Sequence, residues 1–232
     1  MRSILPKRVP WNKGYTKHTH PSVLKVAQTL RRKPKSNFYQ WQLKNKVQYH
    51  LLEKNEDLAE FYGLLLGDGC IERLSRCEKV SISCNKREEV RISRIKRMMT
   101  KIFRKEAKLR YRKTSRCVDV YFYQKHLSKR LRFPVGEKLK HRLSIPLWIC
   151  ANPVYTVRCL KGLFESDGDR VVDLENYTDV IKFTNFSPSL LEQIYRILKN
   201  FGFHPQLRHH DVRLARKLEV KEFVHLIRFS KL

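Results

Sequence analysis

Residues 61–69 read FYGLLLGDG, and residues 160–168 read LKGLFESDG. In both stretches two small residues stand four positions apart and are followed by Asp. These positions are Gly63, Gly67 and Asp68 in the first stretch, and Gly162, Ser166 and Asp167 in the second. Glycine inside a helix costs about 0.5–1 kcal/mol relative to alanine, so its presence needs a packing reason. Small residues four apart lie on one helix face and allow two backbones to approach closely. We therefore predict that the two stretches are helices packed against each other through these faces.

Such packing would bring Asp68 and Asp167 together at the C-terminal ends of the two helices. Neighbouring carboxylates repel each other, and each would lie at the negative end of a helix dipole. A divalent cation relieves this repulsion, and carboxylate oxygens suit Mg²⁺ or Mn²⁺. A metal held there can activate water and stabilise the leaving oxygen of a phosphodiester. We also expect Gly69 and Gly168 to adopt the left-handed backbone that often ends a helix.

The charge of the chain indicates a polyanionic partner. Its 232 residues include 50 Lys and Arg against 22 Asp and Glu, a formal net charge of +28. Self-repulsion of this size destabilises a folded protein, and binding to nucleic acid offsets it. The apolar content of 41% is typical of a globular protein, so the charge does not indicate disorder. These numbers predict a folded protein that binds DNA or RNA.

The sequence argues against several other classes of protein. It has no run of about 18 apolar residues, which excludes a membrane span, and its first residues lack the apolar core of a signal peptide. The six cysteines form no CxxC pair and belong to a chain too long to need disulfides. We therefore expect reduced cysteines, no zinc site, and an intracellular location in the cytoplasm, the nucleoid or an organelle.

The apolar pattern divides the chain into three parts. Residues 1–56 have a net charge of +11, from 13 basic and 2 acidic side chains, and little periodicity. They predict a basic DNA-binding arm with one short helix over 22–31, although a solvated tail also fits their composition. Residues 57–145 and 146–232 each predict a helix, two strands, a helix, two strands and a helix. The fold class is therefore α+β, with two pseudo-symmetric αββαββα half-domains and Asp57 as the N-cap of the first motif helix.

The paired motifs resemble those of the LAGLIDADG homing endonucleases, in the single-chain form with two motif copies. The resemblance covers about residues 57–232, and it includes SISCNKREE after the first motif and GEKLKHRLSIPLWI before the second. PWNKGYTK near the N-terminus is similar to a small modular DNA-binding motif attached to some homing nucleases. The resemblance implies antiparallel sheets that form a saddle over double-stranded DNA, and metal-dependent cleavage across the minor groove that leaves short 3′ overhangs. It also implies a monomer encoded within a mobile intron or a similar element.

The resemblance carries over to a small set of residues. Asp68 and Asp167 match the family's metal-binding acidic positions. Lys86 lies near the position where such enzymes keep a basic residue that stabilises charge, although an ordinary solvated lysine fits this position equally. The comparable stretch of the second half has Asn185 and no lysine, and its nearest basic residue is Lys182. This departure predicts unequal cleavage of the two DNA strands, or nicking.

We expect the strands to carry the DNA-reading side chains, because one face of each strand meets DNA while the other packs on helices. Arginine reads guanine edges, and lysine mostly contacts phosphates. The predicted DNA-binding residues are Lys79, Lys108, Arg110, Arg112, Arg116, Lys182, Arg208 and Arg213 of the half-domains, with Lys13 and Lys17 of the arm. The tryptophans are interpreted as packing anchors rather than base-stacking platforms; they are Trp11, Trp41 and Trp148.

Other functions remain open beside a DNA endonuclease. A non-catalytic binding protein, either an RNA maturase of the LAGLIDADG type or a nuclease that has lost cleavage, fits the missing second lysine. An endonuclease domain inside an intein fits poorly, because no splicing-domain halves flank the motifs. His209-His210-Asp211 could suggest an HNH nuclease, but no matching Asn and His follow. We interpret these residues as polar positions of a strand turn.

Overall fold

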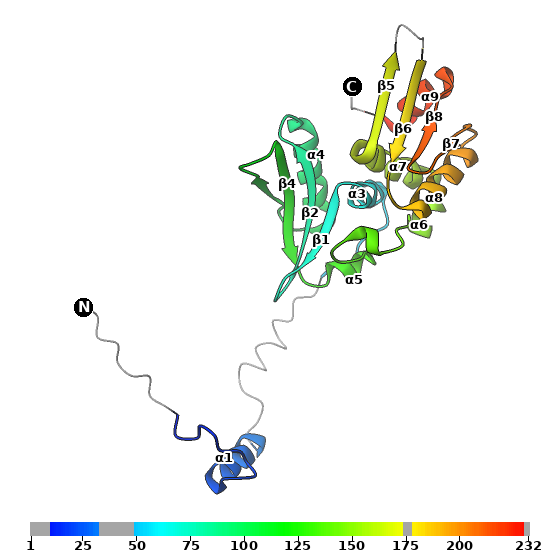
Figure 1. Ribbon diagram of the computed structural model, residues 1–232. Helices are drawn as coiled ribbons and strands as arrows, with labels where there is room; N and C mark the ends of the chain where they lie inside the picture. The colour runs from blue at the N-terminus through cyan, green and yellow to red at the C-terminus, as the bar shows by residue number, and fades with distance from the viewer. Residues whose placement is uncertain (1–9, 33–48, 174–177, 230–232) are drawn as a thin grey trace. The chain divides into compact units, whose positions relative to one another are not determined.

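The computed structural model describes residues 10–32, 49–173 and 178–229 (Figure 1). The chain forms two compact units, Met1–His50 and Leu51–Leu232.

The first unit contains one described helix, α1 (Pro21–Arg32), which confirms the short helix predicted in the basic arm. Before this helix, the His20 ring lies 4.6 Å from the ring of Tyr15 and 6.2 Å from that of Trp11, measured between centroids. Trp11 contacts His20 but keeps 63% of its surface exposed, so it is not the packing anchor that the sequence suggested; Trp41 lies outside the described residues.

The second unit consists of two halves with the same order of elements. The first half contains α3 (Glu56–Leu66), β1 (Gly69–Arg73), β2 (Glu78–Asn85), α4 (Glu89–Phe103), β3 (Lys108–Tyr111), β4 (Cys117–Gln124) and α5 (Leu127–Leu131). A 3₁₀ turn (Lys138–Lys140) and α6 (Leu147–Cys150) connect it to the second half. The second half contains α7 (Pro153–Asp167), β5 (Gly168–Asp173), β6 (Thr178–Thr184), α8 (Pro188–Asn200), β7 (Gln206–Leu207), β8 (Asp211–Leu214) and α9 (Lys217–Ile227). The predicted α+β class and the repeated αββαββα order are confirmed.

Each half has one four-stranded antiparallel sheet with a helical layer on one face. The strand orders are β1-β2-β4-β3 and β5-β6-β8-β7, so the two sheets have the same topology. Alternation decides which face is covered, because successive strand residues point to opposite sides. In the central strands the apolar residues Val80, Ile82, Val120, Phe122 and Ile181 are fully or almost fully buried. Figure 1 shows α3 and α7 side by side between the two sheets, so the helices join the halves.

The sequence predicted the wrong N-cap for the first motif helix. The cap is Asn55, whose side chain accepts a hydrogen bond from the Leu58 backbone amide at 2.9 Å, two residues before the predicted Asp57. Asp57 lies in the first turn instead and forms an ion pair with Lys101 at 2.6 Å. A side-chain oxygen is favourable at either position, because both positions lie at the positive end of the helix dipole. The residue types alone therefore did not show whether Asn55 or Asp57 is the N-cap.

The structure also tests two of the excluded classes. All six cysteines lie within the described residues and all are free, as expected for reduced thiols. Across residues 10–32, 49–173 and 178–229, no helix combines the length and the apolar character that a membrane crossing requires.

Candidate active site

The motif helices α3 and α7 pack against each other through their glycines. A Cβ atom added at Gly63 would lie 2.1 Å from the Cys159 carbonyl oxygen, and one added at Gly162 would lie 2.3 Å from the Glu60 carbonyl oxygen. One turn later, a Cβ at Gly67 would lie 2.3 Å from the Ser166 Cβ. No side chain fits at these three positions without moving the opposite backbone or Ser166. The predicted helix contact is therefore present, and it is backbone against backbone.

This contact brings Asp68 and Asp167 to the same end of the helix pair. Asp167 is the last residue of α7, and Asp68 follows α3 by two residues. The Asp167 Oδ2 atom lies 3.6 Å from the place that a Gly67 Cβ would occupy, next to Asp68 in the chain. Both carboxyl groups are partly exposed, so they are open to solvent and to a ligand.

Gly69 and Gly168 do not have the left-handed backbone that the sequence suggested. Gly168 has φ −85° and ψ 149°, and Gly69 is not among the glycines with positive φ. Instead, each glycine allows the chain to pass close to the preceding turn of its helix. A Cβ at Gly69 would lie 2.5 Å from the Leu65 Cα, and a Cβ at Gly168 would lie 2.3 Å from the Phe164 carbonyl oxygen. The chain turns from helix to strand so tightly that only a residue without a side chain fits.

The two aspartates have different neighbours. Asp68 accepts a hydrogen bond from Arg91 of α4 at 3.1 Å, and this arginine is also bound to Glu88 at 2.8 Å. Asp167 accepts one from the Asn185 amide at 2.9 Å. A guanidinium charge therefore stabilises the first carboxylate, whereas a neutral dipole contacts the second. The hydrogen-bond partners of the two aspartates therefore differ between the halves, an arginine in the first and an asparagine in the second.

Lys138, which the sequence analysis did not single out, lies between these groups. Its ammonium donates to the Leu66 carbonyl at 2.9 Å and to the Gly67 carbonyl, at the C-terminal end of α3. Burial lowers the pKa of Lys138 below its ordinary value, and the charges of Asp167 and Asp68 partly offset this decrease. A cation at a helix C-terminus stabilises the dipole and reduces the repulsion between the two aspartates. The only sequence signal for it was its place in GEKLK, within the stretch before the second motif.

Lys86 and Lys182 have partners of their own in the free protein. The Lys86 ammonium donates to the Arg112 carbonyl at 2.9 Å, which directs it toward the turn between β3 and β4. Lys182 forms an ion pair with Asp169 at 3.3 Å on β5. Their predicted roles in charge stabilisation stay predictions.

The predicted DNA-binding residues fall largely on one face of each sheet, which we call the outer face. In the first half, Val80 and Ile82 of β2 point to the covered face, so the residues of β2 and β4 that alternate with the buried ones lie on the outer face. Lys108 and Arg110 of β3 lie on the outer face too, and both are exposed. Arg112 also reaches this side, because its guanidinium binds Asp119 at 2.7 Å and Ser83 at 3.2 Å.

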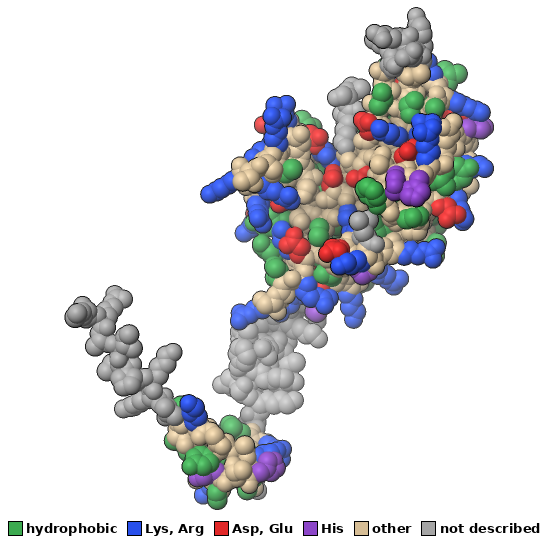
Figure 2. Space-filling view, viewed as in Figure 1, with side chains coloured by type: hydrophobic (Ala, Val, Ile, Leu, Met, Phe, Trp, Pro, Cys, Tyr) green, Lys and Arg blue, Asp and Glu red, His purple; other side chains and the backbone are tan. Residues whose placement is uncertain are grey.

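The remaining predicted contacts differ in how available they are. Lys79 is buried, with 7% of its side chain exposed, and pairs with Glu72 at 3.3 Å, so it is less available than the sequence suggested. In the second half, Lys182 and Arg213 face each other across β6 and β8. Four further members of the set are also exposed: Arg116, Arg208, Lys13 and Lys17. Figure 2 shows Lys and Arg side chains distributed over both halves with acidic residues among them.

The residues present fit a hard divalent cation. Asp68 and Asp167 supply carboxylate oxygens at one end of the helix pair, as Mg²⁺ and Mn²⁺ prefer. Within the described part of the chain, no group of three or more His, Cys, Asp or Glu side chains could hold a metal ion. A cation at the aspartates would therefore take its other ligands from water and from phosphate oxygens, which Mg²⁺ typically retains.

Comparison with known proteins identifies the fold. Residues 155–231 match the family model of the LAGLIDADG-like domain. The structure of I-DmoI in complex with DNA and Mn is 20% identical and has a TM-score of 0.54, with 76% of this chain and 98% of that chain covered. I-WcaI bound to its DNA recognition sequence is 17% identical with a TM-score of 0.59, covering 87% and 91%. The N-terminal LAGLIDADG domain of WhiA is 16% identical with a TM-score of 0.50, covering 80% and 88%. A search of curated protein sequences found no match.

Proposed function

We propose that this chain, whose residues 155–231 match the LAGLIDADG-like domain and whose fold is that of the single-chain homing endonucleases I-DmoI and I-WcaI, cuts double-stranded DNA at a long, specific site. The observation that carries the proposal is the meeting of Asp68 and Asp167 at one end of two helices whose glycines allow backbone contact. Two partly exposed carboxylates beside a partly buried lysine suit phosphodiester hydrolysis, in a protein whose charge of +28 suits a polyanionic substrate.

In this mechanism Asp68 and Asp167 would hold Mg²⁺ or Mn²⁺, which supplies activation of water and stabilisation of the leaving oxygen when bound. Arg91 and Asn185 hold the two carboxylates in place by the hydrogen bonds described above. Lys138 fixes the end of α3 and keeps a positive charge beside both aspartates. The outer faces of the two sheets would hold the duplex, with arginines reading base edges and lysines contacting phosphates.

The direct test is cleavage of a supercoiled plasmid. The plasmid carries the two sequences that flank this gene, joined directly to each other without the gene between them. With Mg²⁺ we expect the protein to convert the plasmid to a linear form. Because the first aspartate faces Arg91 and the second faces Asn185, we expect a nicked intermediate to accumulate before linearisation. Supercoiled plasmid that persists while the DNA is fully bound would instead support a binding protein or an RNA maturase.

The pH dependence of cleavage can separate the effect of the Lys138 charge from the effect of its size. We expect Lys138→Met to lower the single-turnover cleavage rate at least about 10²-fold, the typical effect of losing one preorganised charged donor. Because burial lowers the pKa of Lys138, the wild-type rate should fall with rising pH below the range in which an ordinary lysine loses its proton. Lys138→Arg should keep its rate there, since guanidinium stays protonated.

The matched control for this prediction is Lys140→Met, two residues further along. Lys140 is exposed and forms an ion pair with Glu137 at 2.9 Å, so its loss should change the rate less than twofold. An identical pH profile in wild type and Lys138→Arg would contradict the assigned role of the Lys138 ammonium.

The basic arm gives a prediction about salt dependence. Removing residues 1–48 should weaken DNA binding, and each lost phosphate contact should reduce the slope of log K against log salt by about 0.9. The deletion ends before Lys54 and Asn55, because these residues cap or contact the motif helices. In the full chain, replacing Lys13 and Lys17 with Gln should give part of the same reduction. An unchanged slope in both variants would show that the arm does not contact DNA.

A further inference from the structure

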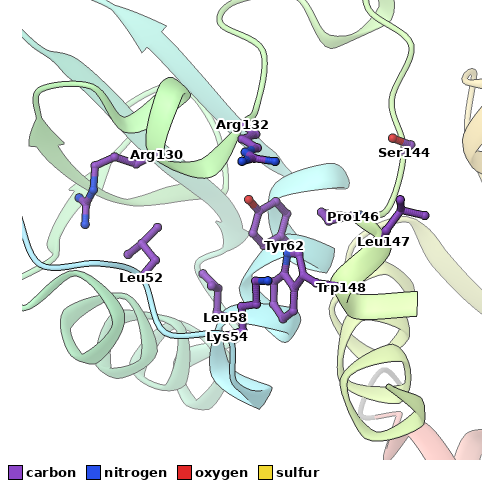
Figure 3. A pocket seen from close by; sticks show the side chains of 10 residues that line it. All are labelled: Leu52, Lys54, Leu58, Tyr62, Arg130, Arg132, Ser144, Pro146, Leu147 and Trp148. Carbon is purple, nitrogen blue, oxygen red and sulfur yellow. The ribbon is translucent and has the colours of Figure 1, made fainter. Parts of the chain in front are cut away.

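A pocket of about 520 Å³ opens beside the beginning of α3 (Figure 3). Leu58 and Tyr62 of α3 line it, ten and six residues before Asp68. At 1.5 Å per residue, these side chains start about 15 Å and about 9 Å along the helix axis from Asp68. The C-terminal end of α5 and the beginning of α6 complete the wall. The pocket is therefore separate from the candidate active site.

The aromatic side of the pocket is rigid. The Trp148 ring packs edge-on against Tyr62 and Tyr155, with centroids 6.0 and 5.7 Å apart. The Tyr62 hydroxyl donates to the Leu131 carbonyl, and the Tyr155 hydroxyl donates to the Lys54 carbonyl at 3.1 Å. Both tyrosines are thus fixed at their polar ends, and together they hold the indole in one orientation. Trp148 is a packing anchor, as predicted, and it also lines the pocket.

The charged side of the pocket is entirely positive. Lys54, Arg130 and Arg132 line it, and none of its lining residues is acidic. Burial raises the pKa of Tyr62 to about 12, and the nearby charge of Arg132 acts against this increase. Figure 3 shows the Arg132 guanidinium on the side of the Tyr62 ring that carries the hydroxyl. Leu147, with 85% of its surface exposed, borders the opening.

From this combination we propose that the pocket binds an unpaired nucleotide of a single-stranded nucleic acid. The base would lie against Trp148 and Leu147, and the phosphate would lie against Arg132 and Lys54. Aromatic side chains beside cations are how proteins hold unpaired bases, with each stacked base worth about 1–3 kcal/mol. A duplex does not offer a base in this way, because its bases are paired and stacked on each other. This site would operate independently of DNA cleavage.

The second half provides an internal comparison at the equivalent place. Arg132 and Arg228 both end their helices with left-handed backbone, at φ 49° and φ 51°. Arg228 lines a pocket of about 430 Å³ beside the beginning of α7. That pocket includes the acidic Glu56, and no tryptophan lines it. Since it lacks both the aromatic platform and the uniform charge, we expect it to bind nucleotides weakly.

The experiment is photocrosslinking with the full chain in EDTA, which prevents metal-dependent cleavage. The probes are 12-nucleotide oligouridine carrying one 5-iodouridine and the matching oligothymidine carrying one 5-iodo-deoxyuridine. Excess duplex DNA is present to occupy the outer faces. We expect crosslinks at Trp148 or Tyr62 with one or both probes, and the comparison of the two probes shows whether RNA or DNA is preferred.

The variants Arg132→Gln and Arg228→Gln form a matched pair, since each removes one positive charge at the same kind of helix end. Arg132→Gln should weaken binding of the probe about tenfold, as expected for one lost charged hydrogen bond to phosphate, while Arg228→Gln should change it less than twofold. Equal effects of the two variants, or crosslinks that duplex DNA removes, would overturn the proposal. So would binding of an acidic peptide at this pocket with no crosslink from either oligonucleotide.

Discussion

Asp68→Asn and Asp167→Asn will each reduce DNA cleavage at least about 10³-fold while leaving DNA affinity within about threefold of wild type. The amide keeps the size and the hydrogen-bonding oxygen of the carboxylate, but it removes the charge that a divalent cation requires. Metal catalysis supplies several kcal/mol of transition-state stabilisation, and each 1.36 kcal/mol is a factor of ten in rate. Affinity should change little because these carboxylates would bind the metal, whereas the outer faces of the sheets would bind most of the duplex.

The matched control is Asp169→Asn. Asp169 lies two residues after Asp167, has 58% of its side chain exposed and pairs with Lys182, so it resembles the test residues without lying at the helix contact. We expect it to keep cleavage within about threefold. The measurement is single-turnover cleavage together with a binding titration in Ca²⁺. A wild-type rate in either test variant would show that the aspartates do not hold the metal.

The two aspartate variants should also differ in their effect on stability, because the two aspartates have different hydrogen-bond partners. Asp68 is balanced by Arg91, whose side chain is only 10% exposed, so Asp68→Asn leaves a buried guanidinium with fewer acceptors. Asp167→Asn leaves Asn185 facing another amide, which can rotate to restore a hydrogen bond. We therefore attribute any difference in stability between these two variants to Arg91 rather than to the metal.

The sequence predicted the parts of the fold that depend on local pattern. Helical spacing and strand alternation gave the repeated order of elements, and the small residues at Gly63 and Gly162 gave the helix contact. The N-cap was placed at the wrong residue because Asn55 and Asp57 satisfy the same local rule. The glycines after the aspartates were assigned a turn conformation, although their actual role is close approach to the preceding helix turn. That role depends on the direction in which the strand leaves the helix, which a local pattern does not contain.

The site residues that the sequence did not predict are mainly those that lie far from the two motifs in the chain. Lys138 lies 70 residues after Asp68, in a connecting segment that has no periodicity of its own. Apart from its place in GEKLK, nothing in its local sequence separates it from the many other lysines of a chain with 50 basic residues. Arg91 and Arg94 were not singled out from the sequence either. The structure shows that both are directed toward the motif helices.

Arg94 connects the two halves through buried charges. It forms ion pairs with Glu60 of α3 and Glu165 of α7, whose side chains are 3% and 1% exposed. Arg158 also binds Glu60 at 3.2 Å, and Lys161 lies 3.9 Å from Glu165. A buried carboxylate that loses its partner retains its desolvation cost. The network therefore makes the contact between the halves sensitive to one side chain of α4.

We expect Arg94→Met to lower the free energy of unfolding by about 1–3 kcal/mol, because Glu60 keeps Arg158 and Glu165 keeps Lys161 while each buried carboxylate loses one charged hydrogen bond. Methionine keeps the length of the side chain, so packing changes little. Urea denaturation measures this, with Arg97→Met as the control on the exposed side of the same helix, which should stay within about 0.5 kcal/mol of wild type. Equal and small losses for the two arginines would mean that the network does not stabilise the contact between the halves. Adding Glu165→Gln to Arg94→Met should then recover nothing, whereas a stabilising network predicts partial recovery, since the second change removes a buried charge that has lost its contact with Arg94.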